Sequence, residues 1–361
     1  MTEPIRVLCV FSRLDRGGAE TMCMNLYRHM DHSKVQFDFV KHTEDEGAYE
    51  QEIRELGGNI YAAPRFQGLN YLTYQKWWNR HFQAHPEHQI VHGHFFTISA
   101  VYFRFAHRNH RITIGHSHST DQKEKKLKTK IKKKLQRLVE RESDYCFACS
   151  EDAGKWLFPH KAFTVLKNAI NTNLFAINEA VRNEVRDELK LSGKLVLGAV
   201  GSLTSVKNPY GMIEIFRAVL AQNKNAVLLW IGDGPYRTAI EQKLVEEQLS
   251  NHVIMTGVRS DVYRLMQAMD VFLLPSIWEG LPVVLIEAQA AGLPCLVSDT
   301  VTKEANLTGL CTYLPNDQPE AWVKPIANMD GSRLDTSAAI MKSGYDIRTT
   351  AKWLEEFYVN L

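Results

Sequence analysis

The 361-residue sequence contains no apolar run as long as a membrane span, and it does not open with a secretory signal peptide. Cysteine is also scarce, with six residues in the chain. These residues are scattered, and most of them lie inside apolar runs that resemble strands. Cysteines placed in this way suit a reducing compartment rather than a disulfide framework. We therefore expect a cytoplasmic protein, possibly peripheral at the inner face of the plasma membrane.

A complete cysteine motif for zinc is missing as well. Cys146 and Cys149 form one CxxC spacing, but no second pair completes a four-ligand set. The alternation of apolar and polar residues around this pair is typical of a strand. The cysteine pattern therefore predicts no metal centre.

Charge and histidine are unevenly distributed along the chain. Residues 1–175 contain 26 Lys and Arg against 19 Asp and Glu, a balance of +7, whereas residues 176–361 contain 17 against 22, a balance of −5. Thirteen of the 14 histidines also fall in the first part. Because the chain is longer than one core usually supports, we expect two domains with different roles. Residues 1–175 form the first, which a helix at residues 346–361 completes, and residues 176–345 form the second.

Strand-like and helix-like patterns alternate in both parts. Repeated β-strand and α-helix units predict two doubly wound parallel sheets, each with helices on both faces. The predicted strands are residues 6–11, 35–40, 90–92, 111–114, 145–149 and 163–166 in the first part, and 195–200, 226–231, 253–255, 271–274 and 295–297 in the second.

The most informative stretch is residues 271–299. A short apolar strand ends at Pro275, a loop carries Glu279, and a helical pattern that contains Glu287 follows. Glu279 then lies at the carboxyl end of a parallel strand, where open α/β sheets bind ligands. Amides at the start of a helix attract phosphate, and carboxylates accept hydrogen bonds from sugar and ribose hydroxyls. This combination predicts a site for a nucleotide-sugar.

A basic segment occupies residues 123–137, where nine of fifteen residues are Lys or Arg. Apolar residues at helical spacing, Leu127, Ile131 and Leu135, make the predicted helix amphipathic. The segment suits an anionic membrane surface, but it equally suits a solvated helix face whose apolar stripe packs in the core. We do not expect nucleic acid as a partner, because no RNA-binding motif accompanies the patch. The candidate docking residues are Lys125, Lys126, Lys130, Lys133 and Lys134.

Several motifs together resemble those of the family 4 retaining glycosyltransferases of GT-B fold, in particular the bacterial capsular and exopolysaccharide enzymes. They are Glu279-x7-Glu287 with the EAQAAGLP stretch, Gly201-Ser-Leu with Lys207, Gly232-Asp-Gly-Pro235, Gly17-Gly-Ala-Glu20, and Asn168-Ala-Ile-Asn171. The resemblance covers nearly the whole chain. It implies two Rossmann-like domains that face each other across a cleft, with the C-terminal helix crossing back to the first.

The resemblance also implies roles for residues of the second domain. Glu279 would contact the hydroxyls of the donor sugar, and Glu287 would hold the ribose hydroxyls. The backbone of Gly280 and Leu281 would lie against the sugar and the diphosphate. Lys207 would neutralise the diphosphate.

Two glycines and a histidine carry the implied roles of the first domain. His118, in the segment Gly115-His-Ser-His-Ser119, is the preferred match to the family histidine that reaches the donor sugar, ahead of the alternatives His116, His92 and His94. The loop at Gly17 and Gly18 would close over the donor.

The sequence departs from the family pattern at two positions. Ser202 stands where the family usually has arginine, so Lys207 would act alone or with another basic residue such as Arg259. Pro282 replaces the second glycine of the family's EGFG loop, which removes one amide donor.

The resemblance implies retaining transfer without a protein nucleophile, from a UDP-sugar to a lipid-linked saccharide. The transferred group would be a hexose or an N-acetylhexosamine, and the product a surface polysaccharide. Because the sequence contains no Asp-x-Asp, we predict that no divalent metal or other cofactor is required. The alternatives are a GT-B-shaped UDP-sugar epimerase and a non-catalytic module that binds nucleotide-sugars.

Overall fold

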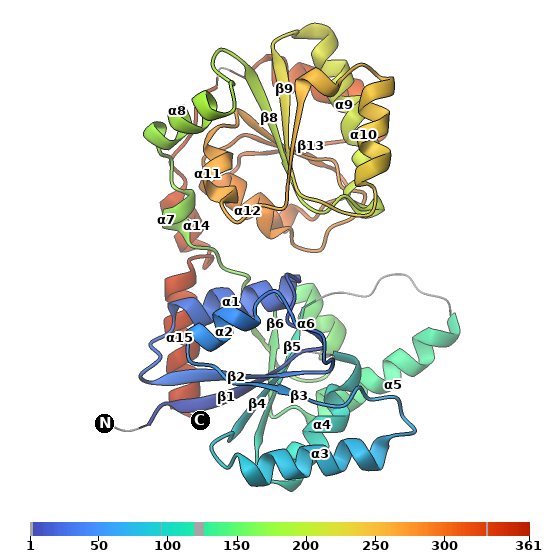
Figure 1. Cartoon of the computed structure of the whole chain (residues 1–361), viewed down its shortest axis with the longest axis vertical. Helices are drawn as coiled ribbons and strands as arrows, with labels where there is room; N and C mark the ends of the chain where they lie inside the picture. The colour runs from blue at the N-terminus through green and yellow to red at the C-terminus, as the bar shows by residue number, and fades with distance from the viewer. Residues whose placement is uncertain (1–2, 95, 119–125, 330) are drawn as a thin grey trace. The chain divides into compact units, whose positions relative to one another are not determined.

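The computed structural model describes residues 3–94, 96–118, 126–329 and 331–361, and it divides into two compact units (Figure 1). Unit 1 comprises Met1–Ala169 together with Ile347–Leu361, and unit 2 comprises Ile170–Asp346. Each unit contains one sheet whose hydrogen-bonded neighbouring strands run parallel, with helices on both faces. The predicted class, two doubly wound α/β units, is confirmed.

The sheet of unit 1 has seven strands in the order β3-β2-β1-β4-β5-β6-β7. Its central strands are buried along most of their length. β1 is almost wholly apolar, whereas β2 also buries the polar residues Gln36, Asp38 and Lys41. The strands are β1 (Ile5–Val10), β2 (Val35–Lys41), β3 (Ile60–Ala62), β4 (Ile90–Gly93), β5 (Ile112–Ser117), β6 (Tyr145–Ala148) and β7 (Thr164–Val165).

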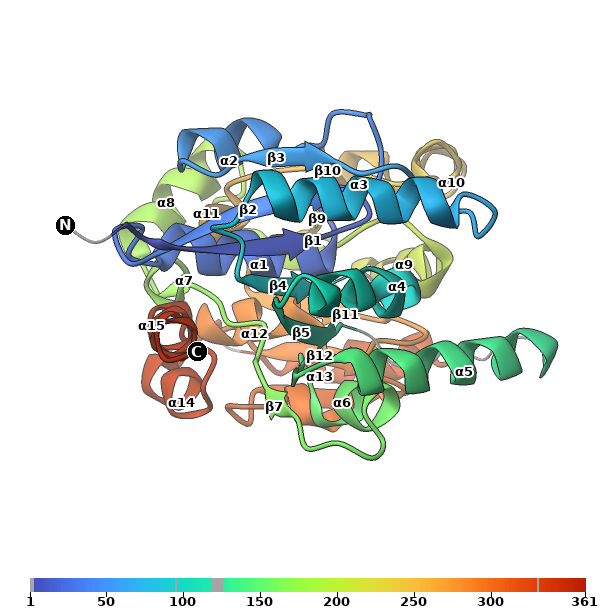
Figure 2. The ribbon, with the colours of Figure 1, turned by 90° about the horizontal axis from the view of Figure 1, so that it is seen from below.

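Two helical layers cover this sheet. Side chains of α1 and α15 pack on one face, and side chains of α3, α4 and α6 pack on the other. Figure 2 shows α3, α4 and α5 following one another across that second face. The helices are α1 (Gly18–His29), α2 (Glu50–Glu55), α3 (Tyr71–Ala84), α4 (Phe96–Arg108), α5 (Lys126–Glu142), α6 (Glu151–Leu157) and α15 (Ile347–Val359).

The C-terminal helix α15 returns to unit 1, as the fold prediction required. Leu354 and Tyr358 are buried in the same core cluster as residues of β1 and α1. The hydroxyl of Tyr358 lies 2.6 Å from Nδ1 of His92, a residue of β4. The last turns of the chain therefore hold the central part of the first sheet.

The sheet of unit 2 has six strands in the order β10-β9-β8-β11-β12-β13. They are β8 (Leu195–Val200), β9 (Ala226–Ile231), β10 (Val253–Gly257), β11 (Val271–Leu274), β12 (Cys295–Ser298) and β13 (Cys311–Leu314). The bounds of β8, β9 and β11 agree with the predicted ones, because these buried strands are uninterrupted apolar runs between polar or glycine-bearing turns.

Helices also cover both faces of the second sheet. Residues of α11 and α12 belong to one core cluster, and residues of α9 and α10 belong to the other. The α-helices are α7 (Thr172–Phe175), α8 (Glu179–Glu188), α9 (Pro209–Gln222), α10 (Arg237–Glu246), α11 (Val262–Gln267), α12 (Val283–Ala290), α13 (Val323–Ala327) and α14 (Ser337–Lys342). Short 3₁₀ helices are η1 (Ser205–Lys207), η2 (Ser250–His252), η3 (Lys303–Ala305) and η4 (Pro319–Trp322).

The division between the units falls at Ala169 and Ile170, a few residues before the predicted boundary at residue 175. The backbone N–H of Ile170 donates to the carbonyl of Tyr345 at 2.9 Å. Phe175, the last residue of the predicted first domain, is instead buried in the core of unit 2. The segment that begins at Ile170 therefore belongs to unit 2.

The sequence did not predict the edge strands β3 and β13. Their residues are mostly half-buried, so neither strand shows the continuous apolar run that identified the central strands. Among the described residues, every helix is too short or too polar to cross a bilayer.

Candidate functional site

The candidate site of unit 2 lies where β8 and β11 run side by side. β8 has β9 on its other side, so the chain leaves these two neighbouring strands in opposite directions along the sheet. Open α/β sheets bind ligands at such a switch point, at the carboxyl ends of the strands. A pocket lies there, and its polar lining includes Gly201, Ser202, Lys207 and Ser276.

Lys207 reaches this pocket from the loop after β8. The loop ends in the 3₁₀ turn η1, and Asn208 then adopts a left-handed conformation with φ 52°. Oδ1 of Asn208 accepts a hydrogen bond from the Gly211 backbone N–H at 3.2 Å, which caps α9. Nζ of Lys207 forms an ion pair with Oε1 of Glu279. The cap therefore fixes the backbone that carries the pocket's lysine.

Glu279 lies in the loop after β11, and two contacts position it. Oγ of Ser276 donates to Oε1 of Glu279 at 2.9 Å, and the Ile277 N–H donates to the Val206 carbonyl at 2.8 Å, which joins this loop to the lysine loop. Among the described residues, the other oxygen of Glu279, Oε2, has no hydrogen-bond partner. That oxygen remains available to a ligand hydroxyl.

Glu287 lies in the second turn of α12. Its side chain is half-buried, and no hydrogen bond or ion pair joins it to any residue that the structure describes. Burial raises the pKa of Glu287 from 4.5 to about 7, because the charged form is poorly solvated. A half-buried carboxylate without a partner is costly unless a ligand donates hydrogen bonds to it.

The residues between the two glutamates occupy different environments. Gly280 is exposed, whereas the Leu281 side chain packs against the core cluster that contains α12. Pro282 is the residue that precedes α12, rather than its first helical residue, and it provides no side-chain cap. The loop therefore presents backbone rather than a second set of polar side chains.

Ser202 and Arg259 are the two further candidates for binding the donor, and of these two Ser202 alone lines the pocket. Ser202 is exposed and lines the pocket. Arg259 follows β10, which lies two strands away from β8, and its guanidinium pairs with Asp261 at 2.7 Å on both carboxylate oxygens. Among the described residues, Lys207 is therefore the one basic side chain that lines the pocket.

The two glycines of the Gly232-Asp-Gly-Pro235 motif lie where the loops after β8 and β9 come into contact. A Cβ on Gly232 would lie 2.0 Å from the carbonyl oxygen of Gly201, and a Cβ on Gly234 would lie 2.6 Å from that of Leu203. The backbone N–H of Leu203 donates to the Asp233 carbonyl at 2.9 Å. Glycine is required at these positions by the contact between the loops after β8 and β9.

Four histidines gather at the carboxyl ends of β4 and β5 in unit 1. Nδ1 of His94 lies 2.8 Å from Nε2 of His118, and Nε2 of His92 lies 3.1 Å from Nδ1 of His116. The rings of His116 and His118 stack with centroids 4.1 Å apart. His116 is buried and His118 is half-buried, so His118 is the more accessible of the two.

These imidazoles are held neutral. Burial lowers the pKa of His118 and of His92 to about 3, and it also lowers the pKa of His94 and His116. Each ring also disfavours protonation of its neighbours through charge repulsion. At neutral pH the cluster can offer hydrogen bonds without adding positive charge.

The glycine pair lies at the start of α1. Gly17 precedes the helix and Gly18 is its first residue. A Cβ on Gly17 would lie 2.3 Å from a carboxylate oxygen of Glu20, whereas a Cβ on Gly18 would meet no atom within 4 Å. The backbone of unit 1 therefore leaves open space at Gly18.

The basic segment forms the helix α5, whose last turns pack on unit 1. Val139 is buried, and the Glu140 carboxylate accepts the backbone N–H groups of His160 and Lys161. The Lys133 and Lys134 side chains are exposed. Lys125 lies outside the described residues, and Lys126 and Lys130 belong to the helix but have no described side chains.

Sequence reasoning missed Ser276, and it missed the contact between His94 and His118, both of which the structure places at these sites. Ser276 holds Glu279, and its position three residues before that glutamate at the end of a strand could have indicated it. His94 contacts His118 across neighbouring strands. Because β4 and β5 are parallel neighbours, equal positions after each strand could have indicated that pair.

Comparisons with known sequence families cover most of both units. Residues 16–174 match the family described as Glycosyltransferase Family 4, and residues 181–324 match the one described as Glycosyl transferases group 1. The first match covers the histidine cluster, and the second covers Lys207, Glu279 and Glu287.

Curated relatives point in the same direction. The chain is 34% identical to the putative glycosyltransferase EpsF of Bacillus subtilis (strain 168) over 89% of its own length and 87% of that protein. It is 33% identical to the UDP-Gal:alpha-D-GlcNAc-diphosphoundecaprenol alpha-1,3-galactosyltransferase of Escherichia coli over 38% of its own length and 36% of that protein.

Solved structures with a similar fold include Anabaena Alr3699/HepE. Its complex with UDP aligns with a TM-score of 0.79 and 17% identity over 99% of this chain and 100% of that one. Its complex with UDP-glucose aligns with a TM-score of 0.77 over the same shares of both chains, also at 17% identity. At this identity the likeness establishes the fold, which is GT-B.

Proposed function

The chain belongs to the family 4 glycosyltransferases of GT-B fold, and we propose that it transfers a hexose or an N-acetylhexosamine from a UDP-sugar to a lipid-linked saccharide with retention of configuration. Two similar proteins support the donor, and one of them also supports the acceptor. The Escherichia coli relative is a galactosyltransferase whose name gives UDP-Gal and a diphosphoundecaprenol-linked sugar, and the Anabaena protein has structures with UDP and UDP-glucose. We propose that the product enters a capsule or exopolysaccharide.

The observation that carries the proposal is the arrangement of Lys207, Glu279 and Glu287 around one sheet edge. Lys207 lines the switch-point pocket, and Glu279 is held beside it with one free carboxylate oxygen. Glu287, on the following helix, has a carboxylate without a hydrogen-bond or ion-pair partner among the residues that the structure describes. A cation for the diphosphate and two acceptors for hydroxyls are the groups that a nucleotide-sugar requires.

The proposed reaction breaks the bond between the anomeric carbon and the diphosphate oxygen and forms a bond to the acceptor oxygen. The acceptor hydroxyl attacks from the same face as the leaving group, and the departing phosphate takes its proton. Lys207 carries three N–H donors, so it can keep its contact with Glu279 and still meet the negative charge on the leaving oxygen. The proposed reaction then needs no nucleophilic side chain from the protein.

We propose that this transfer requires no divalent cation. Lys207 supplies positive charge at the pocket, and the backbone amides that precede α12 supply further donors. Gly280 is exposed, so its amide is accessible to a ligand. These groups would replace the charge neutralisation that a metal ion provides in other phosphate sites.

We also propose that the protein works at the cytoplasmic face of the plasma membrane. Lys133 and Lys134 are exposed on α5, whose apolar residues turn toward unit 1 in its last turns. Exposed basic residues attract anionic lipid headgroups, and a lipid-linked acceptor carries its own diphosphate.

The test is a transfer assay with UDP-glucose, UDP-galactose, UDP-N-acetylglucosamine and UDP-N-acetylgalactosamine, each with an undecaprenyl-diphosphate-linked sugar and an excess of EDTA. We expect one donor to release UDP only when the acceptor is present, and the product to carry one more sugar with its anomeric configuration retained. Release of UDP from every donor without acceptor, or a strict requirement for a metal ion, would contradict the proposal. Lys207→Ala serves as the inactive control, and Lys224→Ala, an exposed lysine of unit 2, as the active one.

A further inference from the structure

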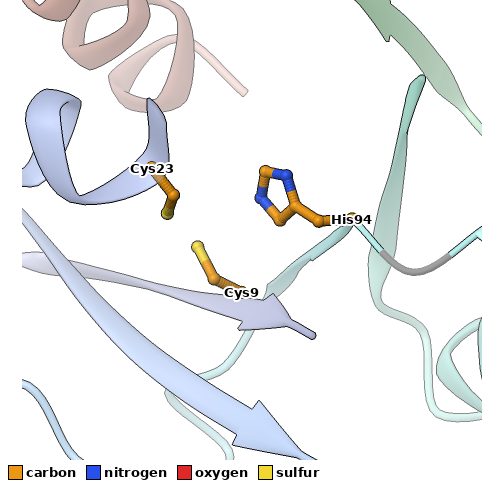
Figure 3. Close-up of side chains that lie close together, drawn as sticks. All are labelled: Cys9, Cys23 and His94. Atoms are coloured by element: carbon orange, nitrogen blue, oxygen red, sulfur yellow. The ribbon is translucent and has the colours of Figure 1, made fainter. Parts of the chain in front are cut away.

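Two cysteines and a histidine from three different elements meet beside the first sheet. Cys9 belongs to β1, Cys23 belongs to α1, and His94 directly follows β4. Both cysteines are free and buried, and one ligand atom from each of the three residues lies within 4.8 Å of the others. Figure 3 shows both sulfurs and one nitrogen of the His94 ring turned toward one another. Such convergence of soft donor atoms is typical of a site for a borderline or soft metal ion.

The hydrogen bonds of His94 leave one nitrogen for this purpose. Nδ1 of His94 lies 2.8 Å from Nε2 of His118, whereas Nε2 of His94 is buried and has no hydrogen-bond partner in the described part of the chain. If Nδ1 donates its proton to His118, the lone pair of Nε2 is free to bind a cation. Metal-binding histidines commonly donate their other N–H in this way, which fixes the ring and its tautomer.

Packing also fixes the plane of the His94 ring. It stacks on Phe11 with centroids 4.4 Å apart and an angle of 4° between the planes, and on His92 with centroids 4.3 Å apart. The ring therefore cannot turn away from the sulfurs without losing these contacts. A preorganised ligand of this kind lowers the cost of binding.

A second group of possible ligands, His92, His94 and His116, shares His94 but is less available. His92 and His116 contact each other at 3.1 Å through ring nitrogens, and His92 also contacts the Tyr358 hydroxyl at 2.6 Å. Both nitrogens of His92 are therefore occupied. The two cysteines provide the better ligands, because thiolates select zinc over magnesium and calcium.

We propose that Cys9, Cys23 and His94 bind a zinc ion, with water as the fourth ligand. Zinc commonly takes three protein ligands and one open position. Two thiolates balance the two charges of the ion, so the occupied site is neutral overall and can be buried. On binding, Cys9 and Cys23 each lose a proton to water, and two zinc–sulfur bonds replace two S–H bonds.

The site is separate from the proposed donor pocket. It lies in unit 1, whereas Lys207, Glu279 and Glu287 lie in unit 2. The ion would tie β1, α1 and the end of β4 together, and it would fix His94, which contacts His118, the residue that we propose for the donor sugar. The ion would therefore act by positioning His94 and His118, and sugar transfer would still need no metal at the diphosphate.

Cobalt(II) tests the proposal, because thiolate-bound cobalt absorbs in the near ultraviolet through charge transfer. Protein stripped of metal under reducing conditions is titrated with Co²⁺ without oxygen, and Zn²⁺ is then added. We expect one Co²⁺ per chain with a thiolate-to-cobalt band, and displacement of that band by one equivalent of Zn²⁺. Cys9→Ala and Cys23→Ala should each abolish the band. Cys146→Ala removes another buried cysteine of unit 1 and should retain it.

A second measurement separates loss of the site from loss of the fold. Zn²⁺ should raise the thermal midpoint of the wild type and of Cys146→Ala, each relative to its own midpoint in chelator, but it should not raise that of Cys23→Ala. The proposal is overturned if the wild type shows no thiolate band, if Cys23→Ala keeps the band, or if Zn²⁺ stabilises all three proteins equally.

Discussion

The two units present different chemistry at the carboxyl ends of their sheets. Unit 2 places charged groups there, namely the ion pair of Lys207 and Glu279 and the unpaired carboxylate of Glu287. Unit 1 places histidines there, and burial keeps their pKa values so low that they are neutral at physiological pH. The same type of sheet therefore supports two kinds of site. In the proposed reaction, the positive charge of Lys207 suits the nucleotide diphosphate. The neutral histidines suit a sugar that becomes positively charged during transfer.

The largest effect should come from removing the charge in unit 2. Lys207→Ala should lower kcat by about 100- to 1,000-fold, because one preorganised donor to a developing charge contributes that much. The measurement is steady-state UDP release with the identified donor and acceptor. Lys224→Ala, which removes an exposed lysine elsewhere in unit 2, should leave kcat unchanged. Equal losses in the two variants would show that Lys207 has no special role.

The basic helix of unit 1 allows the next comparison. Each basic residue near an anionic surface contributes about 1 kcal/mol, so Lys133→Glu with Lys134→Glu should weaken liposome binding by at least about 30-fold. The measurement is co-sedimentation with vesicles that contain anionic lipid. Lys224→Glu with Lys303→Glu changes the net charge equally in unit 2 and should have little effect. Equal binding by all three proteins would refute the docking surface.

Glu287→Gln should weaken the binding of UDP by about tenfold, because hydrogen bonds to a charged acceptor are stronger than those to a neutral one. The affinity of the wild type should rise between pH 6 and pH 8, since Glu287 loses its proton with a pKa of about 7 in the free protein. Titration calorimetry at several pH values measures both effects. Glu304→Gln, an exposed glutamate of the same unit, should change neither. A pH-independent affinity would contradict this role for Glu287.

The same substitution should stabilise the free protein at pH 8. The folded-state pKa of Glu287 lies above its unfolded value of 4.5, so its carboxylate reduces stability progressively as pH rises from about 4.5 to about 7. A pKa shift of this size corresponds to a loss of at most about 3 kcal/mol in the free energy of unfolding. The thermal midpoint of Glu287→Gln should therefore exceed that of the wild type at pH 8 and approach it near pH 4.5.

The smallest effect should come from the neutral cluster of unit 1. His118→Ala should lower kcat/KM by roughly tenfold, the size of a lost hydrogen bond between neutral groups. Because the pKa of His118 is about 3, its protonation should not affect the rate between pH 6 and pH 8. His160→Ala, an exposed histidine of unit 1, is the control. A rate that falls below pH 7 in the wild type but not in His118→Ala would show that this histidine titrates after all.

The sequence predicted most strands of both sheets, including the edge strands β7 and β10, but it missed the edge strands β3 and β13. Buried central strands such as β9 appear as uninterrupted apolar runs, whereas β3 and β13 are half-buried and short. The boundary between the units was misplaced by a few residues because α7 is too short to show a periodic pattern. Apolar runs therefore located the central strands, whereas both missed strands are partly solvated strands at a sheet edge.

The candidate site was predictable in part for a similar reason. Motif spacing identified Lys207, Glu279 and Glu287, but it could not show that Lys207 pairs with Glu279 or that Glu287 has no partner. Arg259 was suggested by its charge, yet it pairs with Asp261 two strands away from β8. Contacts between strands far apart in the sequence, such as that of His94 with His118, became visible only in the fold.

The most direct test of the account is calorimetric titration of UDP, without a sugar, into the wild type, Glu287→Ala and His118→Ala. UDP contains the ribose and the diphosphate but not the transferred group. The account predicts that Glu287→Ala weakens the binding of UDP by at least tenfold, whereas His118→Ala leaves it unchanged. If both variants bind UDP as tightly as the wild type, or if His118→Ala alone loses affinity, the nucleotide does not bind at the switch point of unit 2.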